Sequence, residues 1–243
     1  MKKVFILIFD IVIGAYLVLA ITAFNKPAEK ATVCSEVKID FDDRTDGFLG
    51  QNEIKAILER NRLYPLAKPM ADVDTRRIEE TLQKHPFVEK IECYKTQNGQ
   101  ICITLKQKKP LAHVMTGSGD NYYVDTYGSI LPETRYASDL VVATGTISKK
   151  YAQKQLTCVV NEVMKDEFWR NQIEQVNVLA DGSVEIVPRV GDHILYLGAP
   201  VQIKKKLDRL RKFYLYGLNQ AGWNKYSYIS VEFNNQIICK KAK

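Results

Sequence analysis

The sequence predicts an α+β protein with one N-terminal transmembrane helix, a small strand-helix-helix-strand-strand domain and a mixed α/β domain with a mainly antiparallel sheet. Two observations support this fold class. The first is an apolar run from Val4 to Phe24, which is long enough to cross a bilayer. The second is the alternation of short strand patterns with amphipathic helical patterns over the rest of the chain.

The run from Val4 to Phe24 determines the expected compartment. As a helix it would measure about 31 Å, close to the hydrocarbon thickness of a bilayer. Lys2 and Lys3 precede it, so the positive-inside rule places residues 1–3 in the cytoplasm and the body of the chain on the other side. A cleaved signal peptide ending near Ala23 is the alternative, although its apolar core is usually shorter.

Asp10 is the only charged residue within this span. An ionisable group there is a functional candidate, for example as a hydrogen-bond partner of another helix. Asp10 is also near enough to the start of the run to reach the cytoplasmic interface without a special role. The sequence leaves both interpretations open.

Composition limits the possible classes of protein. The 243 residues are 46% hydrophobic and 26% charged, which excludes a disordered or fibrous chain. The net charge of +7 is spread along the sequence and suits a nearby anionic membrane; an extracytoplasmic body has no nucleic-acid partner. Five Cys without a C-x-x-C spacing and three distant His offer no disulfide framework or short-spaced zinc site.

A polar linker over 25–32 precedes the first domain, which is expected over 33–114. Asn52 and Asp74 are the expected N-caps of its two helices, and Asn98-Gly99 predicts a hairpin turn. The expected elements are a strand over Val33–Phe41, helices over Glu53–Arg60 and Thr75–Lys84, and strands over 87–93 and 101–105.

The hairpin register follows from its apolar pattern. Pairing Cys93 with Ile103 and Ile91 with Leu105 places the apolar side chains on one face. Cys102 then points to the other face, so we expect no disulfide between Cys93 and Cys102.

The second domain is expected over 115–243. Its last helix, Val201–Leu218, should bury Ile203, Leu207, Leu210 and Tyr214 and leave Lys204–Lys206 largely outside. The other expected elements are hairpins over 122–131, 173–187 and 228–240, a strand over 140–147, a helix over 152–166 and a strand over 193–197.

A search for catalytic chemistry finds little. The sequence lacks the G-x-S-x-G, H-E-x-x-H and Walker A motifs, so we expect no catalytic residue, cofactor or small-molecule substrate. An anchored hydrolase is the less favoured alternative, and it would have to use Ser118, His113 or His193. The acidic loop has three candidate cation ligands without EF-hand spacing, and we expect no metal there: Asp42, Asp43 and Asp46.

The C-terminus offers a surface for protein binding. Ile237 and Ile238, followed by Lys240 and Lys241, predict a last strand of the kind found at sheet edges. Such an edge can accept an extended segment of a partner by main-chain hydrogen bonds. A position inside the sheet is the alternative.

Three motifs, in order behind the single anchor, carry a resemblance to a family. They are His85-Pro86-Phe87-Val88 with Ile91, Pro110–Ala112, and Tyr123–Pro132. The sequence resembles the bacterial cell-division family FtsQ, called DivIB in Gram-positive bacteria. The resemblance implies a POTRA domain over 33–114 and the family's β-domain over 115–243.

The resemblance also implies a non-catalytic scaffold in the inner membrane, with its bulk in the periplasm and concentrated at the septum. Its implied partners are FtsB-like and FtsL-like bitopic proteins and other divisome membrane proteins. The implied partner-binding residues are Tyr228, Ile229, Val231, Phe233, Ile237, Ile238 and Lys240. One departure is Gln107, where a Glu often precedes the junction proline. A POTRA-bearing component of secretion or envelope assembly is the alternative.

Overall fold

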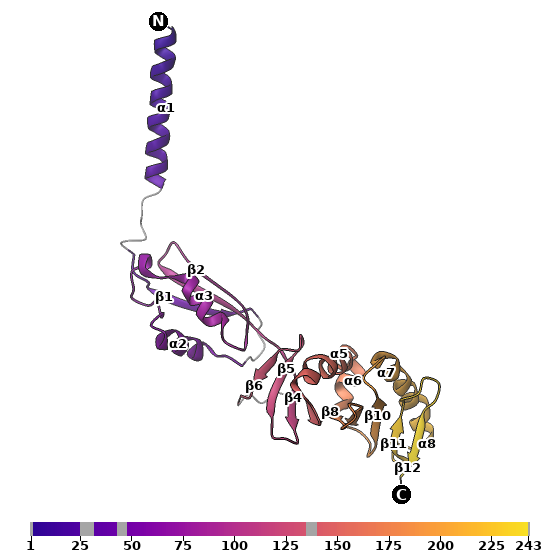
Figure 1. Cartoon of the computed structure of the whole chain (residues 1–243). Coiled ribbons are helices and arrows are strands. Elements are labelled where there is room, and N and C mark those ends of the chain that lie inside the picture. Colours follow the sequence, from indigo (N-terminus) through magenta and orange to yellow (C-terminus); the bar gives the residue numbers. More distant parts are fainter. Residues whose placement is uncertain (1, 25–31, 43–47, 135–139, 243) are drawn as a thin grey trace. The chain divides into compact units, whose positions relative to one another are not determined.

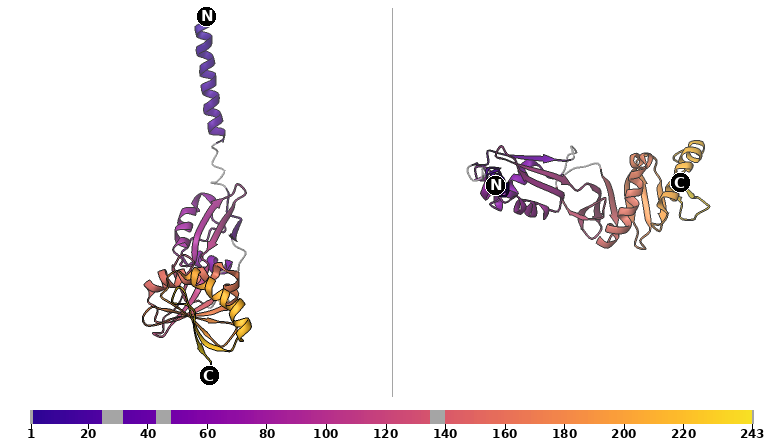
Figure 2. Two further views of the ribbon diagram at one scale, coloured as in Figure 1. Left: turned by 90° about the vertical axis from the view of Figure 1, so that its right-hand side faces the viewer. Right: turned by 90° about the horizontal axis from the view of Figure 1, so that it is seen from above.

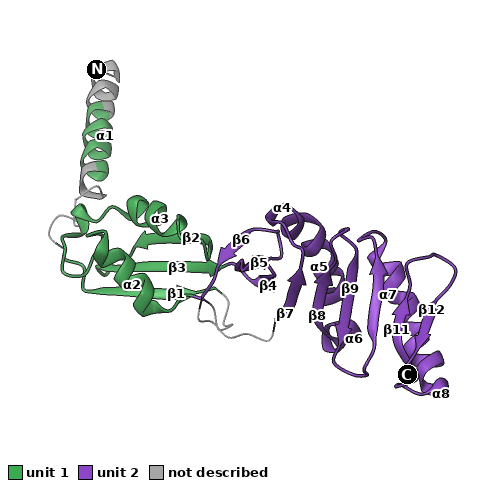
Figure 3. Ribbon diagram, turned by 60° about the horizontal axis from the view of Figure 1, so that its bottom comes forward, with its two compact units in different colours: residues 1–45, 49–107 green, residues 46–48, 108–243 purple. Residues whose placement is uncertain are grey.

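The structure, a computed structural model, describes residues 2–24, 32–42, 48–134 and 140–242. The chain divides into two compact units, one over 1–45 and 49–107 and the other over 46–48 and 108–243 (Figures 1 and 3). Each unit has its own sheet. The expected order of a small domain followed by a larger one is therefore present.

Helix α1 covers Lys2–Phe24, where the sequence predicted a helix. Within the described part of the chain, no helix has both the length and the hydrophobicity that crossing a membrane requires. The membrane span of Val4–Phe24 therefore stays a prediction. The side chain of Asp10 and residues 25–31 of the expected linker lie outside the described residues.

Besides α1, the described part of unit 1 contains a three-stranded sheet, two helices and a 3₁₀ turn. The strand order is β1-β3-β2, with β1 parallel and β2 antiparallel to β3. The helices bury Ile54, Leu58, Ile78 and Leu82 in the core of this unit. The elements are β1 (Glu36–Phe41), α2 (Gln51–Arg60), η2 (Met70–Asp72), α3 (Thr75–Gln83), β2 (Val88–Lys95) and β3 (Gln100–Gln107).

The predicted hairpin register of unit 1 is confirmed. Cys93 lies opposite Ile103 and Ile91 opposite Leu105, while Cys102 pairs with Tyr94. The cysteine thiols are free. Burial raises the pKa of the Cys93 thiol to about 12, so this group is unreactive.

The two helix caps differ in outcome. The Oδ1 atom of Asp74 accepts a hydrogen bond from the backbone N–H of Arg77, as predicted. The prediction for Asn52 is wrong, because α2 begins at Gln51 after Gly50, whose extended backbone provides the start without a side-chain cap.

Gln107 ties the end of β3 to the segment before α2. Its amide donates to the carbonyl of Leu49 and its Oε1 accepts from the N–H of Leu49, both at 3.0 Å. A glutamate carboxylate cannot donate, so it could make only one of these bonds. The departure from the family pattern at this position therefore has a local structural role.

Unit 2 is built on a mixed nine-stranded sheet with the order β12-β11-β10-β9-β8-β7-β4-β5-β6. Figure 2 shows the chain from two further directions. Parallel pairs join β4 to β7, β7 to β8 and β10 to β11, and the other neighbours are antiparallel. The strands are β4 (Pro110–Thr116), β5 (Asn121–Asp125), β6 (Ile130–Pro132), β7 (Val141–Gly145), β8 (Ile173–Val178), β9 (Val184–Pro188), β10 (Ile194–Gly198), β11 (Tyr226–Ser230) and β12 (Ile238–Lys241).

The expected domain boundary after Val114 is wrong. Residues Pro110–Thr116 form β4, which pairs with β5 and β7 and so belongs to the second sheet. Unit 2 therefore resumes at Lys108. The local pattern of β4 indicated a strand, but it carried no information about which sheet the strand would join.

The helices of unit 2 pack their apolar stripes against the sheet. The core includes Leu156, Val160, Trp169, Leu210 and Tyr214. The helical segments are α4 (Lys149–Tyr151), η3 (Ala152–Leu156), α5 (Thr157–Lys165), α6 (Glu167–Gln172), α7 (Ile203–Lys212), η4 (Phe213–Leu218) and α8 (Asn219–Ala221).

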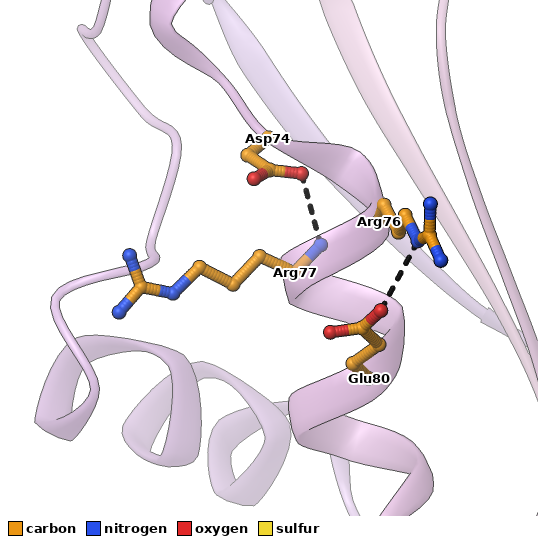
Figure 4. Close-up of polar contacts among 4 residues, drawn as sticks. All are labelled: Asp74, Arg76, Arg77 and Glu80. Carbon is orange, nitrogen blue, oxygen red and sulfur yellow. Dashed lines mark hydrogen bonds and ion pairs between the residues drawn. The ribbon is translucent and has the colours of Figure 1, made fainter.

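We predict that Asp74→Ala lowers the free energy of unfolding by about 1 kcal/mol, because α3 loses its N-cap. Glu80→Ala is the matched control, since the exposed Glu80–Arg76 pair at 3.1 Å on the same helix contributes at most about 0.5 kcal/mol (Figure 4). Urea unfolding followed by circular dichroism measures both. Equal losses would contradict the role of the cap.

Candidate functional site

Strand β12 forms one end of the nine-stranded sheet. In the described part of the chain it pairs only with β11, in a register that places Lys240 opposite Tyr228 and Ile238 opposite Ser230. The side chain of Ile238 is 48% exposed. No side chain of the described residues bonds to the backbone of 238–240. The alternative of a last strand inside the sheet is thus wrong.

Helix α7 forms hydrogen bonds with the segment that joins β11 to β12. The guanidinium of Arg209 donates to the carbonyl of Val231 at 2.6 Å and to the carbonyl of Phe233. The N–H of Val231 donates to the carbonyl of Tyr196 in β10. These bonds tie the start of the segment between β11 and β12 to α7 and β10.

The residues that the resemblance implied as partner-binding differ in how exposed their side chains are. Ile229 and Val231 are fully buried in the core, so their side chains cannot touch a partner, and we correct their assignment. Phe233, Ile238 and Lys240 are exposed. Tyr228 and Ile237 are partly buried.

A groove of about 540 Å³ lies beside the edge, between α7–η4 and the segment before β12. Phe213, Tyr216 and Ile237 supply its apolar wall, and Arg209 and Lys212 supply cations. Its other lining residues are Gly217, Asn234, Asn235 and Gln236. An apolar side chain of a bound segment could enter this groove.

The opposite face of the sheet presents aromatic and charged groups near the edge. The rings of Tyr196 and Tyr228 stack with centroids 5.8 Å apart. The hydroxyl of Tyr228 donates to Glu185 at 3.1 Å, and burial together with this bond raises the pKa of Tyr228. Lys240 stands opposite Tyr228 on β12. The two faces of the edge thus differ in chemistry.

Comparison with known families identifies both units. Residues 109–240 match the model of the family FtsQ/DivIB, C-terminal related, and residues 32–106 match a POTRA-like domain. The chain belongs to the FtsQ/DivIB family. A comparison with curated proteins found no match. FtsQ/DivIB and POTRA-like domains are generally found in non-catalytic proteins.

Lys206 is a structural feature of this FtsQ/DivIB domain that the sequence interpretation missed. The prediction that it lies outside is wrong: its side chain is buried, and Nζ donates to the carbonyls of Leu197 at 2.7 Å and Ala199 at 2.8 Å. Burial lowers the pKa of its amine. Its position three residues after Ile203 and four before Leu210 could have indicated the buried face.

The residues that a hydrolase would use are dispersed in this FtsQ/DivIB chain. Ser118 donates to Asp120 at 3.1 Å, but both are exposed in the turn after β4 and bond locally. His113 bonds to Asn121 instead. Buried His193 bonds to Tyr214 at 2.6 Å, and burial lowers its pKa. No hydrogen bond of the described residues joins Ser118 to either histidine.

The predicted cation ligands fall mostly outside the described residues. Asp42 is exposed at the end of β1, whereas Asp43 and Asp46 are not described. Among the described residues, no group of His, Cys, Asp and Glu could hold a metal ion.

We predict that Lys206→Met lowers the free energy of unfolding by about 1 to 3 kcal/mol, because two carbonyls at the end of β10 lose their donor. The exposed neighbour provides the control: Lys205→Met should change stability by less than about 0.5 kcal/mol. Tryptophan fluorescence in urea reports unit 2. Equal effects of the two changes would refute the inward role of Lys206.

Proposed function

We propose that this FtsQ/DivIB protein is a membrane-anchored, non-catalytic scaffold of the bacterial division complex, and that β12 binds FtsB-like and FtsL-like bitopic proteins. The observation that carries the proposal is the uncovered edge of β12 within a domain of this family. Edge strands present unpaired N–H and C=O groups that an extended segment can satisfy.

The chemistry of the edge indicates which segment would fit. An added strand sends alternate side chains to opposite faces of the sheet. On the helical face they would meet Cys239 and the groove lined by Tyr216, and on the other face Ile238 and Lys240. A segment with an apolar residue for the groove and an acidic residue near Lys240 satisfies both faces.

The anchor and the location are also part of the proposal. Most of the apolar residues of α1 whose side chains are described are exposed, including Phe9, Val12, Leu17 and Ile21, and such a surface suits lipid. With Lys2 and Lys3 inside, the two units would lie in the periplasm and concentrate at the septum. The match of 109–240 to the FtsQ/DivIB domain favours division over secretion or envelope assembly.

We predict that Ile238→Glu weakens binding of the FtsB-like protein from the same genome by at least about tenfold. The new carboxylate would repel the acidic residue that we expect the partner to place near Lys240, on the same face of the strand. Val190→Glu is the control, since Val190 is 49% exposed on the same unit and remote in sequence from the edge. Surface-immobilised full-length chain measures both affinities. Unchanged binding by Ile238→Glu would remove the proposed site.

The division role has a separate test in cells. Depletion of this protein should produce filamentous cells, and complementation by Val190→Glu should restore septation whereas Ile238→Glu should not. Normal septation after depletion would contradict the division role even if β12 binds a partner.

A further inference from the structure

The three-stranded sheet of unit 1 ends at β2, and α3 runs beside this strand (Figure 3). An edge strand normally presents alternate backbone groups that lack a partner. On β2 these outward groups include the N–H of Cys93 and the C=O of Glu89, which bond to α3 rather than to β3.

Two side chains of α3 form hydrogen bonds with these backbone groups. Oε1 of Glu79 accepts from the N–H of Cys93 at 2.6 Å, and Nε2 of Gln83 donates to the carbonyl of Glu89 at 3.2 Å. Glu79 and Gln83 are four residues apart, so they project from one face of the helix. One supplies an acceptor and the other a donor, as an added strand would.

The other edge of this sheet carries a similar contact. Nε2 of Gln51, the first residue of α2, donates to the carbonyl of Ile39 in β1 at 2.7 Å. Both edges of unit 1 are therefore bonded by side chains of its own helices. The backbone of β12 in unit 2 has no such side-chain partner at 238–240 in the described part of the chain.

We propose that α3 closes the β2 edge against strand addition, and that Glu79 is the residue on which closure depends. The strand that closure excludes is β2 of a second copy. With Ile91 opposite Ile91 of the other copy, each Lys90 would face the partner's Glu92, so the pairing is complementary in charge. This inference is independent of what binds β12.

The test compares full-length chains in detergent micelles. Glu79→Ala removes the acceptor of the Cys93 N–H, so at a low concentration, where the chain is monomeric, hydrogen exchange over Val88–Lys95 should accelerate by about tenfold. The opened edges should pair, and light scattering should show a mass that doubles with concentration. Wild-type exchange and wild-type mass for Glu79→Ala would each overturn the proposal.

Two controls separate closure from general effects of a lost carboxylate. Glu80→Ala removes the neighbouring carboxylate, which bonds to Arg76 of the same helix, and should behave as wild type (Figure 4). Glu79→Gln keeps an acceptor oxygen and should also stay closed. Dimerisation of either variant would contradict the assignment to the Glu79 acceptor.

A measurement on the wild-type chain covers the case in which Glu79→Ala does not fold. A peptide with the sequence of β2, added under reducing conditions, should leave exchange over Val88–Lys95 unchanged. Slower exchange there would show that the edge accepts a strand despite α3, and the proposal would fail.

Discussion

The need to pair backbone N–H and C=O groups at strand edges is the constraint on which this structure depends. In unit 1, side chains of α2 and α3 form hydrogen bonds with backbone groups of the two edge strands. In unit 2, β11 pairs in parallel with β10 on the outer side of the sheet, and β12 follows β11 to form the end of the sheet. The contrast between the edges, rather than a pocket, distinguishes the two units.

Cationic side chains of α7 have an inward role that a count of charges does not reveal. Arg209 bonds to carbonyls after β11, and Lys206 bonds to carbonyls at the end of β10. Both supply donors where strands end and the ladder no longer satisfies the backbone. Two of the positive charges of the chain therefore bond to backbone carbonyls near β10 and β11 and are not part of a solvated charged surface.

Local patterns predicted the parts of the fold that are set over short distances. The register of Cys93 with Ile103 followed from apolar alternation, and the cap at Asp74 followed from one residue type before a helix. The membership of β4 in the second sheet and the burial of Ile229 depend on pairings across the sheet. The paired strands are far apart in the sequence, so local periodicity does not reveal which strands pair. The edge strand could therefore be predicted, but the residues buried beside it could not.

The lysines of β12 give the open edge a selectivity that backbone groups alone cannot provide. Main-chain bonding is the same for any extended segment, including a second copy of β12. Two β12 strands paired parallel and in register would place Lys240 opposite Lys240 and Lys241 opposite Lys241, and like charges directly opposite each other repel. A segment with acidic residues gains attraction at the same positions. The charge of β12 therefore disfavours pairing with its own copy and suits a segment of opposite charge.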